Sequence, residues 1–102
     1  MKSQLKDHLE NAQDWEKMET PIPGVSVVKI PATKSRKARL NLEINPLGAD
    51  SYPIKRKGLF IGNAEVLLKI AEAVSHDMVY PLVKEMEIVN PKVIKKIKKL
   101  EM

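Results

Sequence analysis

Residues 25 to 44 read VSVVKIPATKSRKARLNLEI, and they contain the clearest strand pattern of the chain. Apolar and polar side chains alternate over residues 38 to 44, which is the period of a half-buried strand with one wet face. Residues 25 to 30 are rich in β-branched side chains and predict a preceding strand. The two strands are expected to form a hairpin, and its loop at residues 31 to 37 contains Lys34, Arg36 and Lys37.

A third strand is predicted over residues 52 to 61. It follows a stretch typical of a turn, which contains Asn45, Pro46, Gly48 and Asp50. Gly58 interrupts the strand in the manner of a bulge. Lys55 and Lys57 have the strand period of two, so they are expected to share one face, with Arg56 on the other.

Helices are predicted on both sides of this sheet in the sequence. Residues 4 to 18 have apolar side chains at near-helical spacing, and the following Pro-Ile-Pro-Gly run ends the helix. Asn63 is the expected N-cap of a helix to Val74 with one apolar stripe. Further helices are predicted over residues 78 to 86 and, after Pro91, over residues 92 to 99.

The predicted fold class is α+β, with one domain over residues 1–102. It consists of an N-terminal helix within residues 1–20, a basic antiparallel sheet of three to four strands at residues 25–61, and a helical part at residues 63–102. The C-terminal helices are expected to pack on the sheet or to form the interface of a homodimer. A chain of 102 residues has room for one modest core. Its 43% hydrophobic and 30% charged residues exclude a disordered chain.

Several classes of protein are disfavoured by what the sequence lacks. Without cysteine there are no disulfides, thiolate metal sites or cysteine nucleophiles. Its apolar runs are far shorter than the roughly 20 residues that span a bilayer, and its N-terminus is too polar for a secretory signal. A cytoplasmic protein without membrane contact is therefore expected. The supply of Lys, Glu and Ile is typical of a thermophile.

The sequence contains few of the residues and motifs from which a catalytic site is built. The histidines, His8 and His76, are far apart and are expected to be ordinary surface or helix-end residues. The sequence contains no H-E-x-x-H, no G-x-S-x-G and no phosphate-cradling glycine loop, and it has four glycines in all. We therefore expect no catalytic site, no cofactor and no metal.

The positive charge is concentrated in one part of the chain. Residues 1 to 20 contain three basic and five acidic residues, whereas residues 21 to 63 contain eight basic and two acidic residues. Residues 64 to 102 are nearly balanced, with seven basic and six acidic residues, and the net charge is +5. A field concentrated on one part of a small fold attracts polyanions.

A nucleic-acid interface is the interpretation that this charge favours, because each neutralised phosphate releases condensed counterions. Aromatic side chains near the cations supply surfaces on which bases stack. For Phe60 a core position is favoured over a ligand-facing one, and Trp15 is expected either to seal the first helix or to face a ligand. The candidate interface consists of Lys34, Arg36, Lys37, Arg39, Tyr52, Lys55, Arg56, Lys57 and Phe60.

Residues 25 to 74 resemble the single-stranded DNA-binding domain of positive-cofactor-type transcriptional coactivators. The most specific match is the basic stretch at residues 55 to 61 leading into the helix from Asn63. The resemblance implies a curved antiparallel sheet followed by one helix, and a dimer. It also implies that Tyr52 or Phe60 lies against bases and that the DNA backbone is contacted by Lys37, Arg39, Lys55, Arg56 and Lys57.

This sequence departs from that family at several points. The family has a tryptophan where Val66 stands, its strands are richer in aromatic residues, and it lacks the helices after residue 76. The arrangement of the C-terminal half is more similar to the archaeal single-stranded DNA-binding proteins called ThermoDBP. Both resemblances imply binding of single-stranded DNA with little sequence preference, in DNA protection or transcription. RNA binding, and a protein-interaction module with a basic face, are the alternatives.

Overall fold

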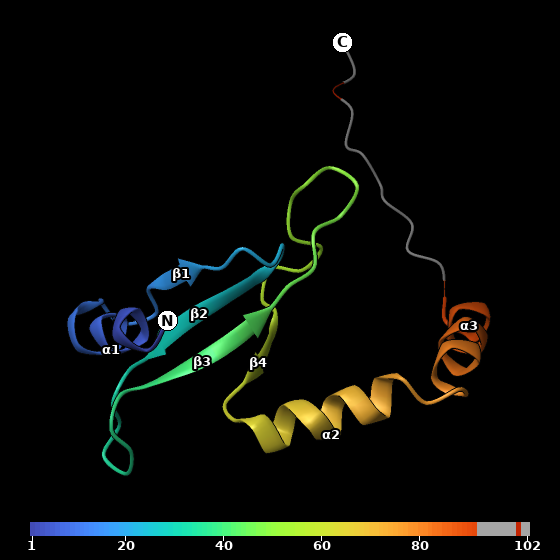
Figure 1. The fold of residues 1–102 in the computed structure, drawn as a ribbon. Helices are drawn as coiled ribbons and strands as arrows, with labels where there is room; N and C mark the ends of the chain where they lie inside the picture. The colour runs from blue at the N-terminus through green and yellow to red at the C-terminus, as the bar shows by residue number, and fades with distance from the viewer. Residues whose placement is uncertain (92–99, 101–102) are drawn as a thin grey trace. The chain divides into compact units, whose positions relative to one another are not determined.

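A computed structural model describes residues 1–91 and residue 100 (Figure 1). The chain divides into two compact units, Met1–Lys69 and Ile70–Met102. The helix predicted at residues 92 to 99 lies outside the described residues. The prediction of a single domain stays a prediction.

The first unit is built around a four-stranded antiparallel sheet in the order β1-β2-β3-β4. This arrangement, with a helix before the sheet and two after it, confirms the predicted α+β class. The elements in chain order are α1 (Lys2–Asn11), β1 (Lys17–Glu19), β2 (Val25–Ile30), β3 (Arg39–Ile44), β4 (Leu59–Ile61), α2 (Ala64–Val74) and α3 (Val79–Val89).

The β2–β3 hairpin is the predicted one. Val25 pairs with Ile44 at one end of the ladder, and Ile30 pairs with Arg39 at the other. The connecting loop, residues 31–38, is here called the tip loop. At its end the backbone turns sharply, because the Thr33 N–H donates a hydrogen bond of 2.8 Å to the Arg36 carbonyl.

The strand register gives the sheet an apolar face and a polar face, because paired residues share a side. The face called apolar includes Met18, Val27, Lys29, Leu40, Leu42 and Ile61. The face called polar includes Lys17, Glu19, Ser26, Arg39, Asn41, Glu43 and Phe60, together with the buried Val28 and Ile30. Leu5 of α1 and Leu67 of α2 line a shallow pocket of about 260 Å³ together with apolar-face residues. Helix α1 and the start of α2 therefore border the apolar face.

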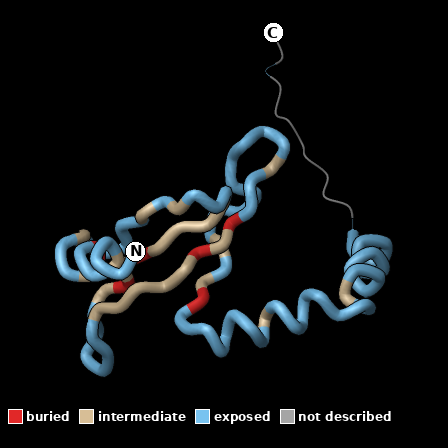
Figure 2. Tube along the Cα trace, viewed as in Figure 1, coloured by how far each residue is buried: buried red, intermediate tan, exposed pale blue. Residues whose placement is uncertain are grey.

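The buried residues are polar as well as apolar, and Figure 2 marks the buried positions along the chain in red. The buried apolar residues are Val28, Ile30 and Ile61, and the buried polar ones are His8, Glu43 and Asn45. The expectation that the polar side of residues 38 to 44 is simply wet is therefore wrong at Glu43, which is only 3% exposed.

The first helix is shorter than predicted: it ends at Asn11, and residues 17–19 form strand β1 instead. Here tertiary pairing overrides helix propensity. The Trp15 N–H donates to the Lys29 carbonyl and the Lys29 N–H donates to the Glu16 carbonyl, so this backbone bonds to β2. His8, expected at the surface, is buried and its Nε2 lies 3.0 Å from the Glu16 carbonyl oxygen.

The third predicted strand is also shorter, since only residues 59–61 pair with β3. Residues 52 to 58 form a loop, apart from one isolated bridge between Leu47 and Pro53. Proline has no N–H to donate to a ladder. Beyond Pro53, the Ile54 N–H donates to the Pro46 carbonyl, and the backbone of Lys55 and Gly58 is bonded to the side chains of residues 45 and 43. The predicted common face of Lys55 and Lys57 on a strand is therefore wrong.

The helices after the sheet agree closely with expectation. The side-chain oxygen of Asn63 accepts a hydrogen bond of 2.9 Å from the Val66 N–H, so it caps α2 as predicted. Helix α3 has Pro81 in its first turn, where proline is tolerated. No helix within residues 1–91 is long and apolar enough to cross a bilayer.

Candidate nucleic-acid interface

The predicted cations lie in two groups at opposite ends of β3 (Figure 1). The first group belongs to the tip loop, which precedes β3 at Arg39. The second belongs to the loop between Ile44 and Leu59, and it includes residues 55–57 as well as Tyr52. The structure thus does not bring the predicted residues together as one continuous cluster. Antiparallel pairing separates them, because the two loops leave β3 at its two ends.

The tip loop is closed by hydrogen bonds of its own backbone and hydroxyl groups. In addition to the backbone bond between Thr33 and Arg36, the Arg36 N–H donates to the Thr33 hydroxyl at 3.2 Å. Three exposed cations belong to this loop: Lys34, Arg36 and Lys37. The local turn fixes the backbone from which they extend.

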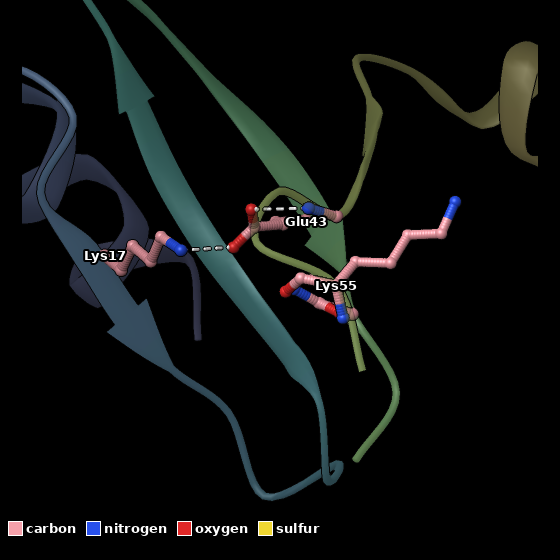
Figure 3. Close-up of polar contacts among 5 residues, drawn as sticks. Lys17, Glu43 and Lys55 are labelled. Atoms are coloured by element: carbon pink, nitrogen blue, oxygen red, sulfur yellow. Dashed lines mark hydrogen bonds and ion pairs between the residues drawn. The ribbon is translucent and has the colours of Figure 1, made fainter. Parts of the chain in front are cut away.

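Residues 55–58, here called the clamped loop, are held at both ends by side chains of β3 and of the residue after it. The buried Asn45 amide donates to the Lys55 carbonyl at 2.7 Å and accepts from the Lys55 N–H at 3.2 Å. One side chain thus replaces two backbone ladder bonds. The Gly58 N–H donates to the Glu43 carboxylate at 3.2 Å. Figure 3 shows the Lys55 side chain extending away from Glu43.

Glu43 is the charged centre of this arrangement. One of its oxygens lies 2.6 Å from Lys17 Nζ, in a pair that crosses β2, and the other accepts the Gly58 N–H (Figure 3). Burial alone would raise the pKa of Glu43, but the hydrogen bonds from Lys17 and Gly58 and the Lys17 charge outweigh it and lower the pKa below 4.5. The carboxylate is therefore ionised and already paired near neutral pH.

Gly58 is required by the close approach of the clamped loop to β3. A Cβ at this position would lie 2.6 Å from the Ile44 carbonyl oxygen and 2.8 Å from the Asn45 Cβ. No other residue type has room there without a shift of the backbone. The glycine that the sequence pattern indicated as a bulge thus lets the loop lie against Glu43 and Asn45.

The cations of the candidate interface have no acidic partners in the described part of the chain. Within residues 1–91 the ion pairs are Lys17–Glu43 and Lys84–Glu87. Asp50, the other acid of residues 21 to 63, accepts a hydrogen bond from the Tyr52 N–H. Arg39 is half-buried at the base of the tip loop, and its Nη1 is buried without a hydrogen-bond partner among the described residues. The charges of the six cations on the two loops are therefore available to an external anion, whereas Arg39 Nη1 is shielded from solvent.

Aromatic side chains accompany the cations at both ends of the sheet. Phe60 is half-buried rather than core, and Lys57 Nζ lies 5.4 Å from its ring centroid. Tyr52 is 71% exposed. Trp15, left out of the predicted interface, is 53% exposed and bonds to Lys29, one residue before the tip-loop end of β2. The sequence left open whether Trp15 seals the first helix or faces a ligand. Its position at this end of the sheet follows from its backbone bond to β2, beside the unpredicted strand β1.

The remaining hollow of the first unit lies on the polar face near the turn before β2. This pocket of about 490 Å³ is lined by Gly24, Ser26, Glu43 and Asn45 among others. Two acids line it: Glu43 is paired with Lys17, and Glu19 is exposed. Within residues 1–91, no three histidine or acidic side chains gather as metal ligands.

Comparison with protein-family models, with curated proteins and with solved structures gives no match to this chain.

Proposed function

We propose that this protein binds single-stranded DNA with little sequence preference, through the tip loop and the clamped loop. The observation that carries the proposal is the set of unpaired cations on two loops whose backbones are fixed by hydrogen bonds. Cations on a fixed backbone lose less conformational entropy on binding than cations on a flexible chain. They meet phosphates, which every nucleic-acid sequence presents alike.

The aromatic residues support the choice of a single strand. Bases of a single strand are free to stack on exposed rings, whereas the bases of a duplex are already stacked on each other. Phe60 and Tyr52 lie beside the clamped loop and offer such rings. A role in DNA protection or transcription, in the cytoplasm, is part of the same proposal.

The direct test is a fluorescence-anisotropy titration of a labelled oligothymidylate with the full chain at several salt concentrations. The variant Lys55→Ala, Arg56→Ala, Lys57→Ala removes the cations of the clamped loop. We expect weaker binding and a salt slope flatter by up to about 2, since each neutralised phosphate of a single strand contributes about 0.7.

A matched control removes the same charge elsewhere in the first unit. Lys2, Lys6 and Lys69 are exposed and lie outside both loops, so their replacement by alanine is expected to leave the slope nearly unchanged. Circular dichroism checks that both variants stay folded. Equal salt slopes for the loop variant and the wild type would show that the clamped loop does not bind the oligonucleotide.

Competition separates DNA from the RNA alternative. Unlabelled oligouridylate and oligothymidylate of the same length are added to the preformed complex. Single-stranded DNA is expected to displace the probe at the lower concentration. Displacement at lower concentration by RNA would assign the protein to RNA instead, because the 2′-hydroxyl is what lets a protein distinguish the two.

A further inference from the structure

The two basic loops are separated by the whole length of β3. Arg39 and Ile44 are the two ends of this strand, and the loops extend beyond them. Five residue steps of about 3.3 Å give roughly 17 Å between the strand ends. A phosphate bound at one loop would therefore lie out of reach of the cations of the other loop.

The strip between the loops, on β3 and β4, carries no unpaired acid on the polar face, and the exposed acid of that face, Glu19, lies on β1, two strands away from β3. On the polar face, β3 contributes Arg39, Asn41 and Glu43, and β4 contributes Phe60. Glu43 is buried and paired with Lys17, so its charge does not face a ligand as a free carboxylate. The strip thus runs from Lys57 and Phe60, past Asn41, to Arg39 and the tip loop.

We propose that one strand of nucleic acid occupies both loops at once and crosses the polar face of β3 and β4 between them. This inference rests on the proposed function and adds a minimum ligand length. A stacked strand advances about 3.4 Å along its axis per nucleotide, so at least about six stacked nucleotides bridge the two loops. Shorter strands occupy one loop at a time.

Simultaneous occupation gives a distinctive dependence on length. Once a strand is long enough, binding at the second loop is intramolecular and occurs at a high effective concentration. As the oligonucleotide is lengthened past this point, its affinity then rises more steeply than the number of positions at which the protein can bind along it. Below this length, loss of one loop leaves the other as an independent site.

The test uses oligothymidylates from about two to about twelve nucleotides with three full-length proteins: wild type, the clamped-loop alanine variant, and the tip-loop variant Lys34→Ala, Arg36→Ala, Lys37→Ala. For the longest strands we expect either loop variant to bind at least about tenfold more weakly than wild type. For the shortest strands we expect the affinity of each variant to be only about twofold lower than that of the wild type, because one of two independent sites remains.

The path between the loops is tested by placing one negative charge on it. Asn41→Asp is expected to weaken binding of the long strands about fivefold, the effect of one like charge near a phosphate, and to leave the shortest strands unaffected. Gln4→Glu, at an exposed position of α1 in the same unit, makes the same change of charge outside both loops and the strip. Equal effects of the two substitutions would contradict the path.

The outcomes separate this inference from the proposed function. If only one loop variant loses affinity, and by the same factor at every oligonucleotide length, the protein binds DNA but the two-loop arrangement is wrong. Absence of binding by the wild-type protein at every length overturns the proposed function itself. A steep rise near six nucleotides that either loop variant abolishes supports both.

Discussion

Glu43 joins three parts of the first unit through one buried carboxylate. It lies on β3, forms an ion pair with Lys17 of β1, and accepts a hydrogen bond from the backbone N–H of Gly58 before β4. Removing a carboxylate from water is costly unless its oxygens are bonded, and here both oxygens are. The residue therefore couples the edge strand β1 to the position of the clamped loop.

Replacing Glu43 by glutamine is expected to lower the free energy of unfolding by about 2 kcal/mol near neutral pH. Glutamine keeps the shape and one acceptor but loses the charge-assisted bond to Lys17, and such bonds contribute about 1.5–3 kcal/mol. Urea unfolding followed by circular dichroism measures the difference. Because Lys17 Nζ can return to water, we expect the variant to fold.

The same substitution predicts a dependence on pH. The folded-state pKa of Glu43 is lowered relative to 4.5, so its ionised form contributes stability above that pH. This contribution is lost as the pH falls through the folded-state pKa. The difference in unfolding free energy between wild type and Glu43→Gln should therefore be nearly constant at neutral pH and shrink as the pH falls below 4.5. A difference that is constant with pH would contradict the assignment.

Gly58→Ala is expected to destabilise the protein by about 1–3 kcal/mol, because the added methyl group would overlap the Ile44 carbonyl and Asn45. Gly62 provides the matched control. There the nearest atom to an added Cβ is the Asn41 side-chain oxygen at 3.4 Å, so alanine is expected to be tolerated. Equal unfolding free energies for the two variants would show that the clamped loop does not lie this close to β3.

At the scale of elements, the clamped loop depends on Asn45 for its conformation rather than for its charge. Asn45→Ala leaves every cation in place but removes both side-chain bonds to the Lys55 backbone. We expect faster amide hydrogen exchange over residues 55–58 and an affinity for long oligothymidylates lower by about threefold to tenfold, since the loop must then be ordered on binding. Unchanged affinity together with faster exchange would mean that the fixed backbone does not contribute to binding.

The elements that the sequence predicted well are those with a strong local pattern. The alternation over residues 38 to 44 and the β-branched run before it gave the hairpin almost to the residue, and Asn63 marked the start of α2. Strand β1 was missed because three residues with a helical pattern around them pair with β2 through long-range contacts. The predicted third strand was too long because Asn45 and Glu43 bond the backbone that a neighbouring strand would otherwise pair.

The candidate interface was predicted by residue type but not by arrangement. Exposure of the cations at residues 34, 36, 37 and 55 to 57 follows from their chemistry. Their separation into two groups follows from the antiparallel register, which a list of residues does not contain. Burial of Glu43 could not be inferred either, because its partner Lys17 belongs to the missed strand.

At the scale of the whole molecule, the excess charge of +5 is carried by loops at the two ends of one hairpin. The homodimer and the thermophilic origin stay predictions from the sequence. No residue of α2 or α3 is buried, and exposed apolar side chains on helices are typical of surfaces that contact a partner. Light scattering on the purified full chain measures the oligomeric state.

The salt dependence of wild-type binding reports how many cations of the two loops neutralise phosphates. A labelled oligothymidylate long enough to reach both loops is titrated at several salt concentrations, and the logarithm of the association constant is plotted against that of the salt concentration. If the seven cations of the two loops and Arg39 neutralise phosphates, the plot has a negative slope of magnitude approaching about 5. A slope near zero, or no binding at low salt, would contradict the account.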